Sequence, residues 1–324
     1  MTDVSQTTTA LPHADTDTDP LHYWIMAGIA ALVIAAPFLV YPFFAMQIML
    51  FAVFALAFNL LLGFGGLLSF GHAAFLGWSS YVAAHSAKVF GFTPELAILA
   101  GTATAMVLGA VFGWLAIRRQ GIYFAMITLA LAQMAYFVAL QAEFTGGEDG
   151  IQGVPRGELF GLIDLDSDMT MYWLAALVFL GSIAFIYRVI HSPFGQVLQA
   201  IRENETRATS LGYETAHYKL IVFVLSATLS GLAGSTKAIA FQIASLTDVH
   251  WAMSGEVVLM TLVGGMGTVF GPIVGASVMV VMQNTLAHLG AWIVIVQGTI
   301  FVVVVLVFRE GIVGMLSKWL KRSL

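Results

Sequence analysis

The chain has 324 residues, of which 59% are hydrophobic and 10% charged, and its formal net charge is −5. A soluble domain carries about 25% charged residues, so this composition excludes a water-soluble protein and, with it, a nucleic-acid-binding protein. A mean hydropathy of +0.90 indicates a membrane protein, and the lack of cysteine excludes disulfides, thiol chemistry and cysteine-based zinc sites.

Residues 1–22 are acidic and contain no Lys or Arg, and we expect a disordered tail. Residues 23–308 predict an all-α, polytopic membrane domain with about eight to ten transmembrane or re-entrant helices, because about 20 apolar residues cross the hydrocarbon core. The expected helices lie near residues 23–41, 43–62, 69–89, 96–117, 122–140, 171–187, 220–240, 256–282 and 291–308.

Lys and Arg form three groups, and short basic loops face the cytoplasm. The groups are Arg118 and Arg119; Arg188, Arg202, Arg207 and Lys219; and Arg309, Lys318, Lys321 and Arg322. We therefore expect the segments 188–219 and 309–324 in the cytoplasm and the acidic loop 141–170 outside.

Two glycine-rich segments interrupt the apolar helices. An even number of crossings must separate Lys219 from a cytoplasmic C-terminus, so one of the last three apolar segments does not span. We expect the helix at 256–282 to break at the glycines 264, 265, 267 and 271 and at Pro272. Gly65, Phe70 and Gly71 correspond to Gly265, Phe270 and Gly271, which suggests an internal repeat. Interrupted helices at matching positions indicate a substrate path, although glycines also let helices pack closely.

The segment 188–219 is much more polar than its surroundings and predicts one short amphipathic helix. Ser192 is its expected N-cap, Pro193 its first residue and Gly212 its end. Val197, Leu198, Ile201, Ala208 and Leu211 would form the apolar face. Glu203 and Arg207 are spaced for an i,i+4 ion pair. A mixed acidic and basic face favours docking to a soluble protein over an interfacial helix on lipid headgroups.

Several stretches together resemble the LivM-type permease subunits of branched-chain amino-acid ABC importers. They run from about residue 59 to residue 316, and they are GQVLQAIRENETRATSLGYETAHYKLIVFVLSATLSGLAG, LLLGFGGLLSFGHAAFLGWSSYVAA, GIYFAMITLALAQM, TGGEDGIQGVP, VGGMGTVFGPIVGA and FREGIVGML. The resemblance implies a permease that pairs with a second, LivH-like permease subunit, two cytosolic ATP-binding subunits and a periplasmic solute-binding protein in the bacterial inner membrane.

The resemblance also implies that residues at the matching positions contact the ATPases. These residues are Arg202, Glu203, Asn204, Glu205, Arg207 and Gly212. We expect no cofactor on this chain, because it lacks G-x-x-x-x-G-K-[ST] and has no soluble region large enough for ATP, so the partner ATPases would use ATP and Mg.

Polar and glycine residues at membrane depth are candidates for the translocation path. They are Asn59, Ser69, His72, Phe75, Gly264, Gly265 and Gly267. The alternatives are hydrogen bonding between helices for the polar residues and a lipid-facing or core position for Phe75. Lys237, about 18 residues after Lys219, would snorkel to the outer surface.

In the external loop, Gly146, Gly147, Glu148 and Asp149 either meet the binding protein or form a plain turn. Asp164, Asp166 and Asp168 resemble the start of a calcium loop, but Met169 replaces the required glycine and Ala175 the bidentate glutamate, so no metal site is expected.

The expected function is transport of a small amino-acid-like solute, with branched-chain amino acids favoured. Similar permeases move urea, short amides or aromatic acids. An ion-coupled secondary carrier is a further alternative, but it normally keeps charged residues at membrane depth, where this chain has almost none. A membrane-embedded enzyme ranks lowest because the usual catalytic motifs are absent.

Overall fold

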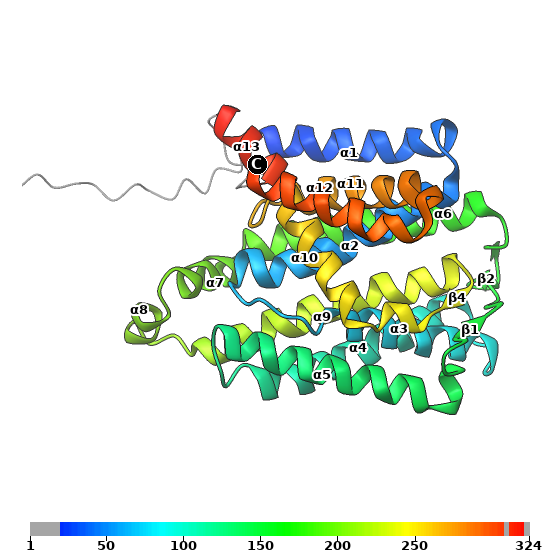
Figure 1. Ribbon diagram of the computed structural model, residues 1–324, viewed down its shortest axis with the longest axis horizontal. Coiled ribbons are helices and arrows are strands. Elements are labelled where there is room, and N and C mark those ends of the chain that lie inside the picture. The colour runs from blue at the N-terminus through cyan, green and yellow to red at the C-terminus, as the bar shows by residue number, and fades with distance from the viewer. Residues whose placement is uncertain (1–19, 308–310, 321–324) are drawn as a thin grey trace, which may run out of the picture.

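The computed structural model describes residues 20–307 and 311–320, and Figure 1 shows helices that run mostly along one common axis. The longer helices are α1 (Pro20–Leu39), α2 (Pro42–Asn59), α3 (His72–Lys88), α4 (Pro94–Ala116), α5 (Ile122–Gln141), α6 (Asp168–Ile190), α9 (Thr215–Ala240), α10 (Trp251–Gly264), α11 (Gly271–Leu286) and α12 (Ile293–Val307). Residues 1–19 of the expected tail and the basic residues Arg309, Lys321 and Arg322 lie outside the described residues, whereas residues 20–22, expected in the same tail, form the start of α1.

The shorter elements gather at the two ends of the bundle (Figure 1). At one end, called here the α7–α8 end, lie α7 (Pro193–Glu203), α8 (Glu205–Ser210) and α13 (Gly311–Leu320). At the opposite end, the strand end, lie the short strands β1 (Ile151–Gln152), β2 (Glu158–Leu159), β3 (Ile163–Asp164) and β4 (Ile243–Ala244). β1 pairs antiparallel with β4, and β2 with β3.

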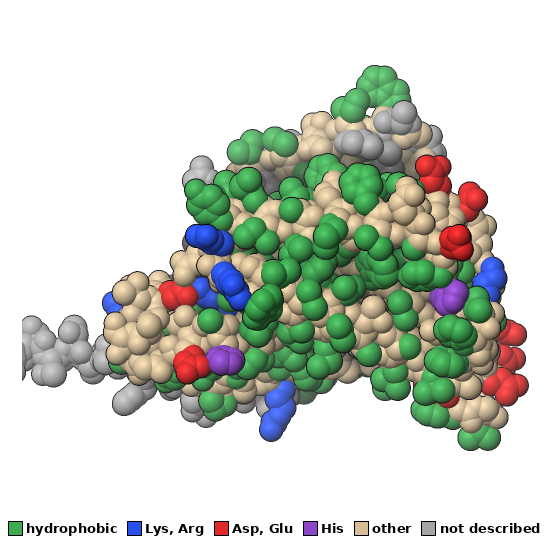
Figure 2. Space-filling model, turned by 90° about the horizontal axis from the view of Figure 1, so that it is seen from below, with side chains coloured by type: hydrophobic (Ala, Val, Ile, Leu, Met, Phe, Trp, Pro, Cys, Tyr) green, Lys and Arg blue, Asp and Glu red, His purple; other side chains and the backbone are tan. Residues whose placement is uncertain are grey.

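The lengths and composition of the helices fit a membrane protein. Five helices in the described part are long and apolar enough to span a bilayer, and they are Pro42–Phe64, Pro94–Ala116, Ile122–Gln141, Asp168–Ile190 and Thr215–Ala240. Figure 2 shows hydrophobic side chains over the middle of one face and charged side chains toward its two ends. Each of the nine expected helices has a counterpart, so the prediction of an all-α polytopic protein is confirmed.

The expected break in the late apolar segment is confirmed. α10 ends at Gly264, α11 begins at Gly271, and the two helices pack against each other as a hairpin. α10 has 14 residues, which at 1.5 Å per residue is about 21 Å, too short to cross a hydrocarbon core of about 30 Å. The hairpin returns to the side from which it started, as the parity of the crossings requires.

α2 forms the centre of the bundle. Nearly all of its side chains from Met49 onward are buried, and it packs against α6, α9, α10 and α11. α3, α4 and α9 form a second closely packed group through small residues. A Cβ at Gly109 of α4 would lie 2.4 Å from the Cβ of Ala227 in α9, and a Cβ at Gly231 would lie 2.2 Å from that of Ala105. Close backbone approach without large side chains is typical of membrane helices.

We predict that Gly275→Ala destabilises the α10–α11 hairpin. A Cβ at Gly275 would lie 1.8 Å from the carbonyl oxygen of Met260, so the two helices must separate. The free energy of unfolding should fall by more than about 2 kcal/mol, measured by thermal unfolding in detergent. The matched control is Gly181→Ala in α6, where nothing lies within 4 Å of the added Cβ. Equal stability of the two variants would contradict the hairpin contact.

Candidate functional site

The two glycine-rich breaks meet at a buried asparagine. α2 continues into a π-helical turn (Leu60–Phe64), and the last residue before this turn is Asn59, which is 2% exposed. The Asn59 side chain donates to the carbonyl oxygen of Thr268 (2.8 Å) and accepts from the backbone N–H of Gly267 (3.0 Å). Both polar atoms of this side-chain amide therefore form hydrogen bonds with backbone groups of the second break. These groups lie between α10 and α11 and have no partner within a helix.

Glycine at position 63 is required for this meeting. A Cβ there would lie 2.2 Å from Asn59 Oδ1 and 2.7 Å from the backbone nitrogen of Gly267. Any side chain at this position would push the two breaks apart. The glycines of the two segments therefore act together, rather than each giving its own helix freedom to bend.

Arg202 of α7 connects the α7–α8 segment to both breaks. Its guanidinium Nη1 donates to the carbonyl oxygen of Gly63. Its aliphatic stem covers Gly66, where a Cβ would lie 2.9 Å from Arg202 Cγ, and a Cβ at Gly267 would lie 3.4 Å from Nη1. We call Asn59, Gly63, Gly267, Thr268 and Arg202 the glycine junction. The structure thus brings together Asn59, Gly267 and Arg202, which the sequence analysis had assigned to two separate sites.

The other two glycines of the second break have their own close contacts. A Cβ at Gly264 would lie 1.9 Å from the carbonyl oxygen of Gly271, where α10 and α11 also approach closely. Gly265 has a backbone φ of +129°, which disfavours residues with a side chain. These glycines allow the hairpin to turn, and their part in a translocation path stays a prediction.

The segment 193–210 forms two helices, so the expectation of one helix is wrong. Ser192 and Pro193 begin α7 as expected, with Ser192 Oγ accepting from the N–H of Gly195 (3.4 Å). Asn204 adopts an extended backbone (φ −157°, ψ 97°), and its side chain caps α8 by accepting from the N–H of Arg207 (2.9 Å). Because the helix stops at Asn204, the i,i+4 pair of Glu203 and Arg207 does not form.

Glu205 points inward and joins α8 to α9. Its carboxylate pairs with Lys219 (2.6 Å) and accepts from Thr215 Oγ1 (3.0 Å). Glu203 and Arg207 are exposed. Of the expected apolar face, Leu198, Ile201 and Ala208 are buried, whereas Leu211 is 72% exposed. Gly212 follows α8 with a φ of +91°, a backbone conformation that favours glycine.

His72 and Phe75 lie in a closed aromatic cluster at the start of α3. Nε2 of His72 is 2.7 Å from Ser226 Oγ, which itself donates to the carbonyl oxygen of Ala57. The His72 ring lies 4.9 Å from the ring of Phe58 and 5.5 Å from that of Phe75, and both His72 and Phe75 are fully buried. This arrangement connects α2, α3 and α9, and a role in the translocation path stays a prediction.

Side chains from other helices cap the interrupted start of α3. The N–H of Phe70 donates to Thr128 Oγ1 of α5 (3.1 Å), and the N–H of Ala73 donates to Ser254 Oγ of α10 (2.9 Å). Ser69 Oγ accepts from the N–H of Gly71 (3.1 Å). Such caps are necessary where a helix begins away from water. Ser254 was missed because no sequence pattern shows which distant hydroxyl meets a free N–H group.

Comparison with known proteins identifies the family. The model of the family described as "Branched-chain amino acid transport system / permease component" matches residues 40–305. The chain belongs to this family of permeases. The resemblance seen in the sequence motifs is therefore confirmed.

Curated relatives agree with the family assignment. The permease is 27% identical to the high-affinity branched-chain amino acid transport system permease protein LivM of Salmonella typhimurium, over 96% of this chain and 79% of the relative. It is 26% identical to LivM of Escherichia coli over the same shares. It is also 27% identical to the ribose import permease protein RbsC of Escherichia coli, over 66% of this chain and 70% of the relative. No solved structure matches.

The strand end of the permease is held together by a buried arginine that the sequence analysis missed. Arg156 is 6% exposed, and it donates to Asp168 Oδ1 (2.7 Å), to the carbonyl oxygen of Asp166 (3.1 Å) and to that of Ala240 (2.9 Å). These contacts join the loop between α5 and α6 to the end of α9. Asp168 therefore forms an ion pair with Arg156, and Asp166 accepts from Arg156 through its backbone carbonyl oxygen.

The predicted external loop residues form a turn in the loop between α5 and α6. Gly146 and Gly147 have φ values of +76° and +61°, and Glu148 and Asp149 are exposed. The turn is followed by β1, whose Ile151 pairs with Ala244. The geometry fits both the plain turn and a surface for another protein, so contact with a binding protein stays a prediction.

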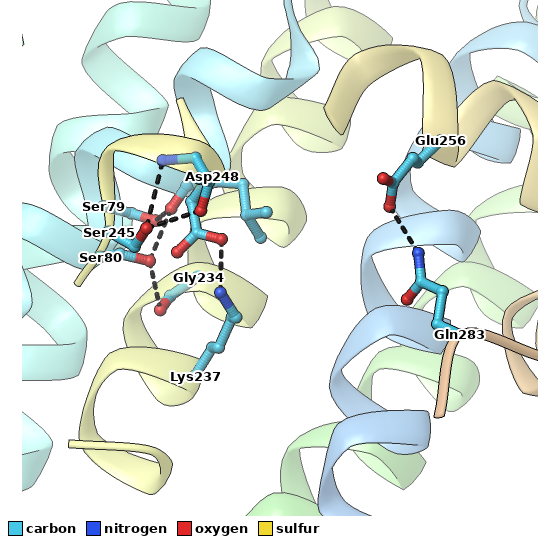
Figure 3. A network of polar contacts seen from close by, with 10 residues as sticks. Ser79, Ser80, Gly234, Lys237, Ser245, Asp248, Glu256 and Gln283 are labelled. Atoms are coloured by element: carbon cyan, nitrogen blue, oxygen red, sulfur yellow. Dashed lines mark hydrogen bonds and ion pairs between the residues drawn. The ribbon is translucent and has the colours of Figure 1, made fainter. Parts of the chain in front are cut away.

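Lys237 does not snorkel, so that expectation is wrong. Its ammonium pairs with Asp248, and the two side chains are 15% and 3% exposed. Figure 3 shows the two side chains pointing toward each other beside Ser245, while Glu256 and Gln283 form a separate contact of 3.0 Å between α10 and α11. The pair fixes the turn before α10 (η3, Leu246–Asp248) to α9. The expectation rested only on the spacing between Lys219 and Lys237 in the sequence, and this spacing does not reveal that Asp248 lies next to Lys237.

We predict that Lys237→Met alone destabilises the permease by about 3–5 kcal/mol, because it leaves the Asp248 carboxylate buried without a counter-charge. The double variant Lys237→Met, Asp248→Leu should recover most of that loss, since two apolar side chains need no partner. Tryptophan fluorescence during denaturant unfolding in detergent measures both. A double variant no more stable than Lys237→Met would show that the ion pair is not the stabilising interaction.

Proposed function

We propose that this permease is a membrane subunit of an ABC importer in the bacterial inner membrane and moves branched-chain amino acids. In this proposal a periplasmic solute-binding protein delivers the substrate, a LivH-like subunit forms the other half of the pathway, and two cytosolic subunits hydrolyse ATP with Mg. The family match and the two LivM relatives support the assignment. The permease itself catalyses no covalent reaction.

The observation that carries the proposal is the Arg202 contact in the glycine junction. α7 is fixed to the bundle by the buried side chains of Leu198 and Ile201, and its next residue reaches the carbonyl oxygen of Gly63. Exposed Glu203 and Arg207 lie within five residues of Arg202. A protein that binds these charges can therefore move α7 and, through Arg202, both breaks at once.

The junction gives such a movement a direct route into the membrane domain. Asn59 joins the end of α2 to the break between α10 and α11, so the two segments must shift together or lose two hydrogen bonds. Packed elements with two discrete arrangements are how a local change at one end reaches a distant site. We place the ATPase contact at Arg202, Glu203, Asn204, Glu205, Arg207 and Gly212, with Glu203 and Arg207 on its exposed face.

The amino-acid substrate rests on the relatives, and the alternatives follow from the breadth of the family. A ribose permease is among the relatives, so similarity at this level extends beyond amino-acid transport. Urea, short amides and aromatic acids are the competing substrates. The decisive observation is which ligand the associated binding protein holds, because that protein presents the substrate to the permease.

An ion-coupled carrier is the competing function, and one observation favours it. Lys237, Asp248 and Glu256 are ionisable groups inside the protein, of the kind that coupling ions require. Lys237 and Asp248 neutralise each other, however, and Gln283 contacts Glu256. Contacts within the protein thus explain the presence of Lys237, Asp248 and Glu256 without a coupling ion.

Reconstituted vesicles test the proposal directly. We expect uptake of radiolabelled leucine by the permease with its LivH-like partner only when the ATPases, ATP, Mg and the loaded binding protein are all present. Ion gradients are held at zero in one set and imposed in another. Uptake without the ATPases that follows the ion gradient would establish the carrier instead.

Charge reversal and truncation separate docking from transmission. Glu203→Lys or Arg207→Glu should reduce co-purification of the ATPases by about tenfold or more, since close charge pairs across an interface contribute strongly. Arg202→Ala should lower leucine uptake by about tenfold, because the contact with Gly63 is lost, while reducing co-purification much less than either charge reversal.

The control is Glu158→Lys, an equally drastic change at an exposed carboxylate of the strand end. It should leave ATPase co-purification unchanged. Normal co-purification and uptake in all three test variants would remove both the docking surface and the glycine junction from the mechanism.

A further inference from the structure

Two hollows flank the turn between α4 and α5 at the α7–α8 end. The first lies between the end of α4 and the start of α9, includes Trp114 and Ala216 in its wall, and has a volume of about 350 Å³. The second runs along the first turns of α5 beside Tyr123 and Met126 and has a volume of about 560 Å³. The turn between them carries two consecutive arginines.

Each hollow combines apolar walls with one of these cations. Arg118 lines the first hollow and Arg119 the second. The guanidinium of Arg118 lies 4.4 Å from the centre of the Trp114 ring, which holds it at the edge of its hollow. Trp114 and Tyr123 are 56% and 67% exposed, as aromatic side chains at the level of lipid headgroups are.

The two arginines are available for an outside anion. Of the carboxylates that the structure describes, none forms an ion pair with Arg118 or Arg119. The ring of His217, which also lines the first hollow, is paired with Glu214 at 2.6 Å. Arg118 and Arg119 therefore place two positive charges without a carboxylate partner among the described residues beside the apolar walls of the two hollows.

The surrounding helix surfaces are apolar and largely uncovered by the rest of this chain. Only 39% of the apolar window of α4 and 33% of that of α5 are buried in the protein, against 83% for α2. Basic pockets between membrane helices on the cytoplasmic side are suited to phospholipid headgroups, and the cytoplasmic leaflet is negatively charged. A soluble phosphate would satisfy the arginines but leave both apolar hollows empty.

We propose that Arg118 and Arg119 bind the headgroup phosphates of an anionic phospholipid whose acyl chains lie in the two hollows. Cardiolipin fits best, because it carries two phosphates for two adjacent guanidinium groups and pairs of chains for both hollows. The residues of this site are separate from those of the glycine junction. It adds a lipid ligand to the proposed transport function.

Native mass spectrometry of the detergent-purified full chain tests the proposal. Cardiolipin is titrated in parallel with phosphatidylethanolamine of the same acyl chains. We expect cardiolipin to bind more tightly, and Arg118→Gln and Arg119→Gln each to weaken it by about fivefold. The control is Arg188→Gln, an exposed arginine of α6 at the same end that lines neither hollow.

A second variant separates a lipid site from a bare charged patch. Ala216→Leu fills the first hollow and leaves both arginines in place, so it should also weaken cardiolipin binding, whereas a purely electrostatic patch would be unaffected. Undiminished binding in either the arginine variants or Ala216→Leu overturns the proposal. So does release of cardiolipin when the assembled transporter forms, because a protein subunit would then be the occupant of the hollows.

Discussion

Backbone that is not helical must find hydrogen-bond partners inside the protein when it lies among apolar helices, because lipid offers none. Both glycine-rich breaks of this permease meet that requirement with side chains from distant segments. Asn59 serves the second break, Arg202 serves the carbonyl oxygen of Gly63, and Thr128 and Ser254 serve the start of α3. The polar residues at membrane depth are therefore explained first by the backbone that they satisfy.

This requirement also explains the concentration of glycine. Two interrupted segments can share one asparagine only if their backbones nearly touch, and Gly63 and Gly267 are the positions at which they do. The same contact brings an arginine of the α7–α8 segment into reach of both. The close packing, the hydrogen bonds and the proposed transmission of movement thus all depend on the residues of the glycine junction.

The fold was largely predictable because long apolar stretches without charged residues mark the segments that cross the hydrocarbon core. Hydrophobic runs located the nine expected helices, and the parity of charged loops located the break between α10 and α11. The details that failed depend on partners far along the chain. The helix stop at Asn204 results from its side-chain cap, and the position of Lys237 results from Asp248, which lies beyond the end of its helix. Likewise, nothing in the sequence indicates that Asn59 and Arg202 lie at the same place.

The beginning of α13 contacts the break between α10 and α11, so movement of the break can also reach α13. A Cβ at Gly311 would lie 2.4 Å from the Cα of Gly265, so this terminal helix starts in direct contact with the second break. A shift of the hairpin at Gly265 therefore displaces the start of α13. A spectroscopic probe attached to α13 would therefore report movements of the break between α10 and α11. No label inside the membrane domain would be needed.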